Sequence, residues 1–180
     1  TPLPVAEING LSSVCSGDVI TFTATDAGAG AIYTWNFGDF ATPATGTGAN
    51  PGPVTYNIPA NVNGNRFATV ILTVLKDGCG DQQTAMIQIL DLPEVTDVSS
   101  TNPTCGDDNG TITVTFTDNP DRTDIEFSIN GAAGPYTTVN DNTGSYTFTD
   151  LDAGSYDLYA RWGDDACPVN IEDATISDED

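Results

Sequence analysis

Carboxylates are the side chains of this sequence best suited to bind a metal ion or take part in a reaction, and most of them lie in its second half. Residues 93–180 hold 19 of the 26 acidic residues and two of the four basic ones. Four of these acidic residues flank the two cysteines of this half: Asp107 and Asp108 follow Cys105, and Asp164 and Asp165 precede Cys167. A disulfide between these two cysteines would hold their Cα atoms about 5.5 Å apart. The four carboxylates would then be tethered together at one end of a domain.

Clustered carboxylates of this kind indicate a calcium site. Calcium takes six to eight oxygen ligands at about 2.4 Å, from carboxylates, carbonyls and water, and tolerates irregular geometry. Without a cation the four groups would repel one another and raise their own pKa values. A second candidate site is a single loop that carries Asp118, Asp121 and Asp124. The alternative for both places is a solvated acidic surface, because no stretch has the ligand spacing of an EF-hand.

The composition excludes most catalytic machinery. The chain has 180 residues and no histidine, so it has no Ser/His/Asp or Cys/His catalytic group and no histidine-bound metal. Glycoside hydrolysis by two carboxyl groups requires them to face each other about 5 to 9 Å apart across a cleft, which small domains rarely offer. We therefore expect no enzyme. A formal net charge of −22 also makes nucleic acid and membrane surfaces poor partners.

The four cysteines are spaced so that each pair would span most of one half of the chain. Cys15 and Cys79 are 64 residues apart, and Cys105 and Cys167 are 62 apart. Of the three possible pairings, only Cys15–Cys79 with Cys105–Cys167 keeps both bonds within one half. Each bond would close a loop of about 65 residues, which stabilises a fold by roughly 4 kcal/mol. Such bonds indicate an oxidising, extracellular compartment, with free buried thiols as the alternative.

Hydrophobic and polar residues alternate along most of the sequence. Period-two alternation with turn clusters at intervals of about ten residues predicts antiparallel strands, and no segment has helical periodicity. The predicted inward-facing sets are Ile20/Phe22/Ala24, Tyr33/Trp35/Phe37, Ala68/Val70/Leu72/Val74 and Ile87/Ile89, then Ile112/Val114/Phe116, Ile125/Phe127/Ile129, Tyr146/Phe148 and Tyr156/Leu158/Ala160/Trp162. We predict an all-β fold of two tandem immunoglobulin-like β-sandwich domains, residues 1–92 and 93–180.

The last of these predicted strands presents a candidate ligand-binding face. While Tyr156 and Leu158 face the core, Asp157, Tyr159 and Arg161 would project outward together. Exposed Tyr and Arg side chains are typical of binding hot spots. The alternative is an ordinary solvated strand face.

The first domain resembles a known family. The stretch Tyr33-Thr34-Trp35-Asn36-Phe37-Gly38-Asp39, followed by residues 68–74 and Asp77-Gly78-Cys79, is similar to a PKD domain, an immunoglobulin-like module of surface proteins. The resemblance covers residues 4–92, approximately. It departs from the family's Tyr-x-Trp-Asp-Phe-Gly-Asp-Gly core at Asn36, which replaces an Asp, and at Phe40, which replaces the final Gly.

The second domain resembles the SprB-type repeats of large Bacteroidetes surface adhesins. The similar segments, within residues 98–176, are Cys105, Gly110-Thr111-Ile112-Thr113-Val114, Gly134-Pro135-Tyr136, Leu151-Asp152-Ala153-Gly154-Ser155-Tyr156 and Cys167. The acidic stretch 118–124 is longer than the short turn usual in these repeats.

Together the two resemblances imply a function outside the cell. We expect non-catalytic structural or stalk modules of a bacterial cell-surface adhesin or surface filament. Two alternatives stay open: a glycan- or protein-binding module, with or without calcium as a bridging ion, and a self-assembling filament subunit with an unpaired strand edge. The expected partners are neighbouring β-sandwich modules or copies of the chain itself.

Overall fold

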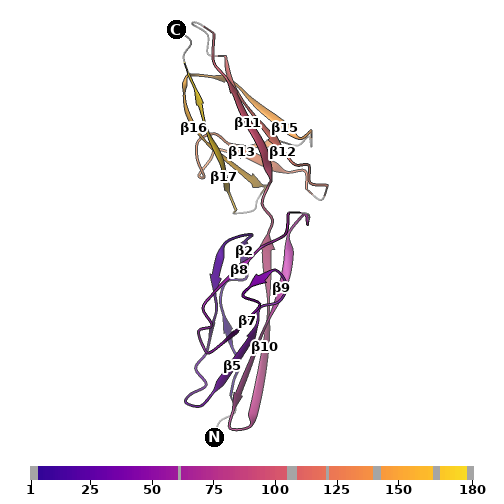
Figure 1. Ribbon diagram of the computed structural model, residues 1–180, viewed down its shortest axis with the longest axis vertical. Helices are drawn as coiled ribbons and strands as arrows, with labels where there is room; N and C mark the ends of the chain where they lie inside the picture. Colours follow the sequence, from indigo (N-terminus) through magenta and orange to yellow (C-terminus); the bar gives the residue numbers. More distant parts are fainter. Residues whose placement is uncertain are drawn as a thin grey trace. The chain divides into compact units, whose positions relative to one another are not determined.

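The computed structural model divides into two compact units, Thr1–Asp91 and Leu92–Asp180 (Figure 1). The predicted boundary stands one residue later. The structure describes residues 4–60, 62–104, 109–120, 122–139, 143–163 and 167–177. The described residues contain strands but no helices, so none of them forms a helix able to cross a membrane.

The described residues of the first unit form ten strands. They are β1 (Ile8–Asn9), β2 (Ser13–Cys15), β3 (Val19–Thr21), β4 (Thr23–Ala24), β5 (Ile32–Asn36), β6 (Ala41–Thr42), β7 (Thr45–Thr47), β8 (Pro53–Tyr56), β9 (Arg66–Lys76) and β10 (Cys79–Leu90). One sheet has the order β2-β10-β9-β5-β7, and a smaller sheet has the order β3-β8-β6, with β1 paired to β4. The large sheet is antiparallel except where β2 runs parallel to β10.

The core of the first unit follows the predicted alternation. On β5, Tyr33 and Trp35 are buried while their neighbours are exposed, as expected for strands with one face against a second sheet. Trp35 is completely buried, and its indole N–H donates to the Gly48 carbonyl at 2.9 Å. Tyr56 is also buried and donates its hydroxyl to the Phe37 carbonyl at 2.9 Å. Burial raises the pKa of Tyr56 to about 12, so this hydroxyl stays a donor at physiological pH.

A two-residue turn joins the two longest strands. Asp77 (φ 51°) and Gly78 (φ 78°) connect β9 to β10, with Lys76 paired to Cys79 across the turn. Positive φ at both central residues defines the turn type whose twist matches that of the flanking strands, which explains the Asp-Gly sequence. The register then runs without a bulge over eleven residue pairs.

The turn after β5 contains the residues that carried the PKD resemblance. Asn36 accepts the Gly38 N–H at 2.9 Å. Gly38 has φ 78°, and a Cβ there would lie 2.7 Å from the Thr69 carbonyl oxygen, so only glycine fits. Phe40 has φ 67°. Phe40 therefore has a left-handed backbone conformation, which the glycine of the motif would adopt with less strain. The ring of Phe40 is partly buried against the core.

In the second unit, the part of the chain that the structure describes forms seven strands, in two sheets of three and four. They are β11 (Val95–Thr101), β12 (Gly110–Phe116), β13 (Ile125–Ser128), β14 (Thr137–Val139), β15 (Ser145–Leu151), β16 (Gly154–Trp162) and β17 (Val169–Ile176). Their orders are β11-β12-β15 and β14-β13-β16-β17, with all neighbours antiparallel. Each unit has its own buried cluster of apolar residues. The predicted fold, all-β with immunoglobulin-like sandwiches, is confirmed.

A tyrosine fixes the corner between β15 and β16. Tyr156 donates its hydroxyl to the Asp152 carbonyl at 2.8 Å, four residues upstream. A tyrosine hydrogen-bonded back to the chain at the corner before the penultimate strand is a hallmark of immunoglobulin-like sandwiches. Trp162, at the far end of the same strand, is 2% exposed and belongs to the core, in agreement with its predicted place on the inward face.

Replacing Tyr156 by Phe tests this corner. Tyr156→Phe removes one hydrogen bond and little apolar area, so we expect it to lower the free energy of unfolding of the second unit by about 1 kcal/mol. The measurement is urea denaturation followed through amide signals of residues 110–176. Tyr159→Phe on the same strand is the control, because the Tyr159 hydroxyl makes no hydrogen bond among the described residues. Equal effects of the two substitutions would contradict the assigned role.

Candidate functional site

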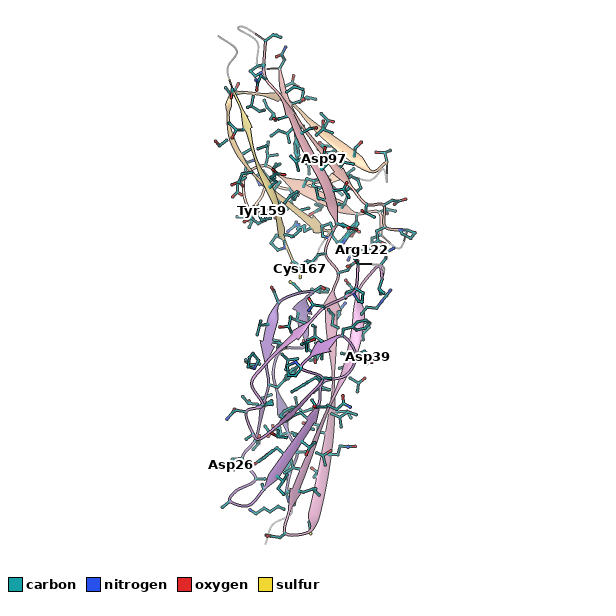
Figure 2. The ribbon with its side chains drawn as sticks, in the orientation of Figure 1. Asp26, Asp39, Asp97, Arg122, Tyr159 and Cys167 are labelled. Atoms are coloured by element: carbon teal, nitrogen blue, oxygen red, sulfur yellow. The ribbon has the colours of Figure 1, made fainter. Side chains whose placement is uncertain are left out.

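The outward face of the four-stranded sheet in the second unit carries the predicted ligand-binding residues. Asp157, Tyr159 and Arg161 alternate with buried Leu158 and Ala160 along β16, so they share one face as predicted. Asp157 is exposed, and the other two are half-buried. Tyr159 is labelled in Figure 2, on the sheet that contains β16 and β17. Whether these residues bind a ligand stays a prediction.

Arg161 is held by two neighbours that the sequence did not identify. Glu126 lies opposite Arg161 on β13, and its carboxylate accepts the Arg161 Nε–H at 2.7 Å. The other oxygen of Glu126 accepts the Thr138 hydroxyl at 3.0 Å. The guanidinium also lies over the ring of Tyr136, with its carbon 4.0 Å from the ring centroid, which is a cation–π contact. Arg161 is thus positioned by an ion pair and an aromatic ring together.

Asp157, at the other end of this face, stands beside a second carboxylate. It is opposite Asp173 on β17, and its oxygen accepts the Asn170 amide at 3.2 Å. Desolvation, followed by the charge of Asp173 and a hydrogen bond with it, raises the pKa of Asp157. The ionised pair is therefore a local source of repulsion in the folded state.

The charges of this face limit the ligands it suits. Three carboxylates, those of Glu126, Asp157 and Asp173, stand with one guanidinium, that of Arg161. The net charge is negative, so an anionic ligand would be repelled. The arrangement favours a neutral or cationic polar ligand, to which the tyrosine ring and the carboxylate oxygens would offer contacts.

Most of the predicted calcium ligands lie outside the described residues, namely Asp107, Asp108, Asp121, Asp164 and Asp165, as does Cys105. Asp118 is exposed. Asp124 forms an ion pair with Arg122 at 3.0 Å, and a hydrogen bond from that guanidinium is the main cause that lowers the pKa of Asp124. Among the described residues no three Asp, Glu or Cys side chains form a group able to hold a metal ion. The calcium site stays a prediction.

The structure corrects the predicted pairing of Cys15 with Cys79. Cys79 is a free, exposed thiol, whereas Cys15 and Cys167 are each disulfide-bonded. Cys15 is opposite Leu90 at the end of β10, and Cys79 begins that strand. Eleven residues of extended strand separate those positions by about 36 Å, far beyond the roughly 7 Å that a disulfide can span. The sequence spacing gave no information on this distance.

Sequence reasoning also missed Glu126, Tyr136 and Asp173 at the candidate face. Glu126 lies at an outward position of a strand that the alternation did predict. Its contact with Arg161 depends on which strands are neighbours, over a separation of 35 residues. Only a prediction of strand order could have identified this pair.

Comparison with known proteins identifies no family for this chain. No protein-family model matches the chain, and no curated protein matches it. The chain is similar to solved structures of modular β-sandwich proteins. Over 98% of its length it matches the FN1–FN3 domains of chicken CNTN1 (18% identity, TM-score 0.37) and an I-band fragment of titin (11%, 0.39). It covers 66% of each of those chains, slightly less than two thirds. Over 96% of its length it matches fibronectin(III)-like modules of Clostridium thermocellum CbhA (13%, 0.36), of which it covers 94%.

The carboxylate pair predicts a pH dependence. Because the pKa of Asp157 is raised in the folded state, its ionisation weakens folding at neutral pH, and this loss disappears as the pH falls through the carboxyl range near pH 4. Asp173→Asn should lower the pKa of Asp157 and stabilise the second unit at pH 7, with no gain below about pH 3.

An NMR titration of the Asp157 carboxyl, with unfolding measured in parallel, tests this expectation. Glu172→Gln is the matched control, because it removes a carboxylate from the same strand at a position that does not oppose Asp157. An unchanged Asp157 titration in Asp173→Asn would refute the coupling.

Proposed function

We propose that the chain is a pair of structural modules from a bacterial cell-surface adhesin or surface filament, and that it resists tension along the chain. The observation that carries this proposal is the parallel pairing of β2 with β10 in the first unit. Strand β2 lies near the start of the unit, and β10 is its last strand. In the register of the pair, Ser13 is opposite Gln88, Val14 opposite Ile89 and Cys15 opposite Leu90.

Parallel pairing of these two strands decides how the unit responds to force. Backbone bonds run from Gln88 N to Ser12 O and from Ser16 N to Leu90 O, each 2.9 Å long. Tension that pulls the two ends of the unit apart acts along these strands, and the bonds lie across them. They must break together in shear, whereas the rungs of a hairpin pulled open would break one at a time. The ladder therefore resists tension as a group.

The first and last strands of the second unit meet differently. Ser100 of β11 donates its hydroxyl to the Thr175 carbonyl of β17 at 3.4 Å, and Ser177 N donates to the Asn102 side chain at 3.0 Å. Side chains make both contacts, and no ladder joins β11 to β17 in the described residues. The second unit should yield at a lower force.

Other observations support the location and the class of protein. Two disulfide-bonded cysteines are compatible with an oxidising compartment outside the cytosol. The resemblances to PKD domains and to SprB-type repeats both point to surface proteins. The solved structures that the chain is similar to are described as domains, fragments or modules of larger proteins.

One observation favours a second candidate function, that of a self-assembling filament subunit. The Gln88 N–H points away from β9, so by alternation the backbone groups of Gln82, Thr84 and Met86 point the same way. Along this stretch β10 pairs with β9 on one side, and among the described residues no strand pairs with it on the other. Beside it, a small groove of about 100 Å³ is lined partly by the exposed side chains of Leu11 and Met86. An open edge next to an apolar groove is suited to adding an extended strand.

Single-molecule pulling tests the main proposal. With both ends attached in reducing buffer, so that disulfides bear no tension, we expect two unfolding events. The event of the first unit should occur at the higher force, because its parallel ladder must shear.

The two events can be assigned with a variant that weakens only one unit. Tyr156→Phe should shift the low-force event and leave the high-force event unchanged. Val14→Pro, which removes an N–H from the middle of β2, should lower the high-force event. Two events of equal force, both insensitive to Val14→Pro, would argue against a tension-resisting role.

The calcium site has its own test. At matched ionic strength, we expect the midpoint of thermal unfolding to be several degrees higher in millimolar calcium than in EGTA. A cation that binds only the folded state stabilises it. The double variant Asp107→Asn/Asp165→Asn should lose this difference. Asp97→Asn/Glu172→Gln removes the same charge elsewhere in the second unit and should keep it. Coincident melts of the native protein would show that the acidic loops are a solvated surface.

A further inference from the structure

The outward face of the large sheet in the first unit carries no charged residue. The outward positions are Ser13 and Cys15 on β2; Ile32, Thr34 and Asn36 on β5; Thr45 and Thr47 on β7; Phe67, Thr69, Ile71, Thr73 and Leu75 on β9; and Gly80, Gln82, Thr84, Met86, Gln88 and Leu90 on β10. All of these strands lie in the described part of the chain. Asp, Glu, Lys and Arg make up 30 of the 180 residues, so their absence from eighteen neighbouring positions sets this face apart.

The charged residues of these strands lie on the opposite, inward side of the sheet. Arg66, Lys76 and Asp81 occupy inward positions near strand ends. Lys76 donates to the Ala27 carbonyl at 2.6 Å, and Asp81 accepts the Ala6 N–H at 2.8 Å. Each of these two bonds leads to a loop or segment at the end of the sandwich. The flat outer face is left to hydroxyl, amide and apolar groups.

This neutral face also gathers exposed apolar side chains. Ile32, Phe67, Leu75 and Met86 are 63%, 57%, 47% and 64% exposed. They are four of the seven large apolar residues that are exposed among the described residues, and all seven lie in the first unit. In the register, Leu75 is opposite Ile32, and Met86 is diagonal to Phe67. Burying these side chains against a flat partner would release apolar surface from water.

The charge distribution selects a second copy as the occupant. The chain carries a net charge of −22, so two copies repel each other across most of their surfaces. The first unit holds seven acidic and two basic residues, against nineteen and two in the second. The neutral face is therefore a place where two identical chains can touch without bringing carboxylates together. The same face on both partners also satisfies the symmetry of a twofold dimer.

The size of the face matches a weak dimer. Each residue in a sheet covers about 16 Å², from a rise of about 3.3 Å and a strand spacing of about 4.8 Å. The five strands hold 34 residues, so the face measures about 550 Å² and a pair of faces buries about 1,100 Å². Specific protein–protein interfaces bury a total of at least about 1,000 to 1,200 Å². Sheets can also pack face to face about 10 Å apart, as they do inside a sandwich.

We propose that the neutral outer face of the sheet β2-β10-β9-β5-β7 is a self-association surface, on which two copies of the chain pack sheet against sheet. This inference does not depend on the adhesin assignment. Because burial of apolar surface opposes charge repulsion, association should strengthen as salt screens the repulsion. A partner held by charge complementarity would show the opposite dependence.

Sedimentation velocity of the full chain tests the proposal, in a Cys79→Ser background that removes disulfide exchange at the exposed thiol. We expect a reversible dimer whose fraction rises with concentration up to about 500 µM and is several-fold larger in 0.5 M than in 0.05 M NaCl. Thr69→Glu and Met86→Glu, both on the face, should each weaken dimerisation at least about tenfold, because burying an unpaired carboxylate costs well over 1.4 kcal/mol. Circular dichroism melts confirm that the variants are folded.

Two matched controls separate this surface from others. Ser145→Glu adds the same charge on β15 of the second unit and should leave the dimer unchanged. Leu11→Glu places a carboxylate in the groove beside the open edge of β10 and off the neutral face, so it opposes edge-to-edge pairing and should also leave the dimer intact. A dimer abolished by Leu11→Glu but not by Thr69→Glu would overturn the proposal in favour of the edge.

Other results would overturn the proposal outright. A monomer at every concentration and salt would do so, as would a dimer that weakens with salt. Binding of the monomeric chain to an insoluble neutral polysaccharide, lost in Thr69→Glu, would assign the face to a glycan surface instead.

Discussion

Alternation of side chains across each strand is the constraint on which the rest of this structure depends. Each unit has about 90 residues, and its described part contains no helix, so one core between two sheets must supply the stability. Alternate residues of β5, β9 and β12 are therefore apolar and buried, except Arg66 and Lys76 at the two ends of β9. The remaining positions are free to vary, and the two units use this freedom differently. The first displays a neutral sheet face, whereas the second displays Glu126, Asp157 and Arg161.

This division separates two kinds of surface within one chain. In the first unit, charged side chains of the large sheet are withdrawn to inward positions at strand ends, and its outer face can approach another flat surface. In the second unit, carboxylates on neighbouring strands keep the surface hydrated and are balanced in part by Arg161 and Arg122. The surface for self-association thus lies in the first unit, and the charges that keep the chain hydrated lie mostly in the second. This separation lets a chain with a large negative charge associate without bringing carboxylates together.

The sequence was sufficient for the features set by local pattern. The alternation around Trp35 and Trp162 predicted their burial, and Asp77-Gly78 encodes the turn between the two longest strands by itself. Features that depend on strand order were not accessible. The partner of Arg161 lies 35 residues away, and Cys79 stands at the opposite end of β10 from the strand pair that holds Cys15. Residue counts between cysteines give no distance, because an extended strand and a hairpin of equal length place their ends very differently.

The way in which each unit is closed also governs how it folds. The first unit is joined by a bond from Ala6 to Asp81, and the second by a bond from Ser100 to Thr175, each between residues 75 apart in sequence. A chain that leaves a ribosome or an export channel N-terminus first cannot make these contacts until nearly the whole unit has emerged. Topologies dominated by such distant contacts fold in milliseconds to seconds, slowly for domains of this size. Each unit can therefore acquire its structure only in a late step, once nearly all of its residues are available.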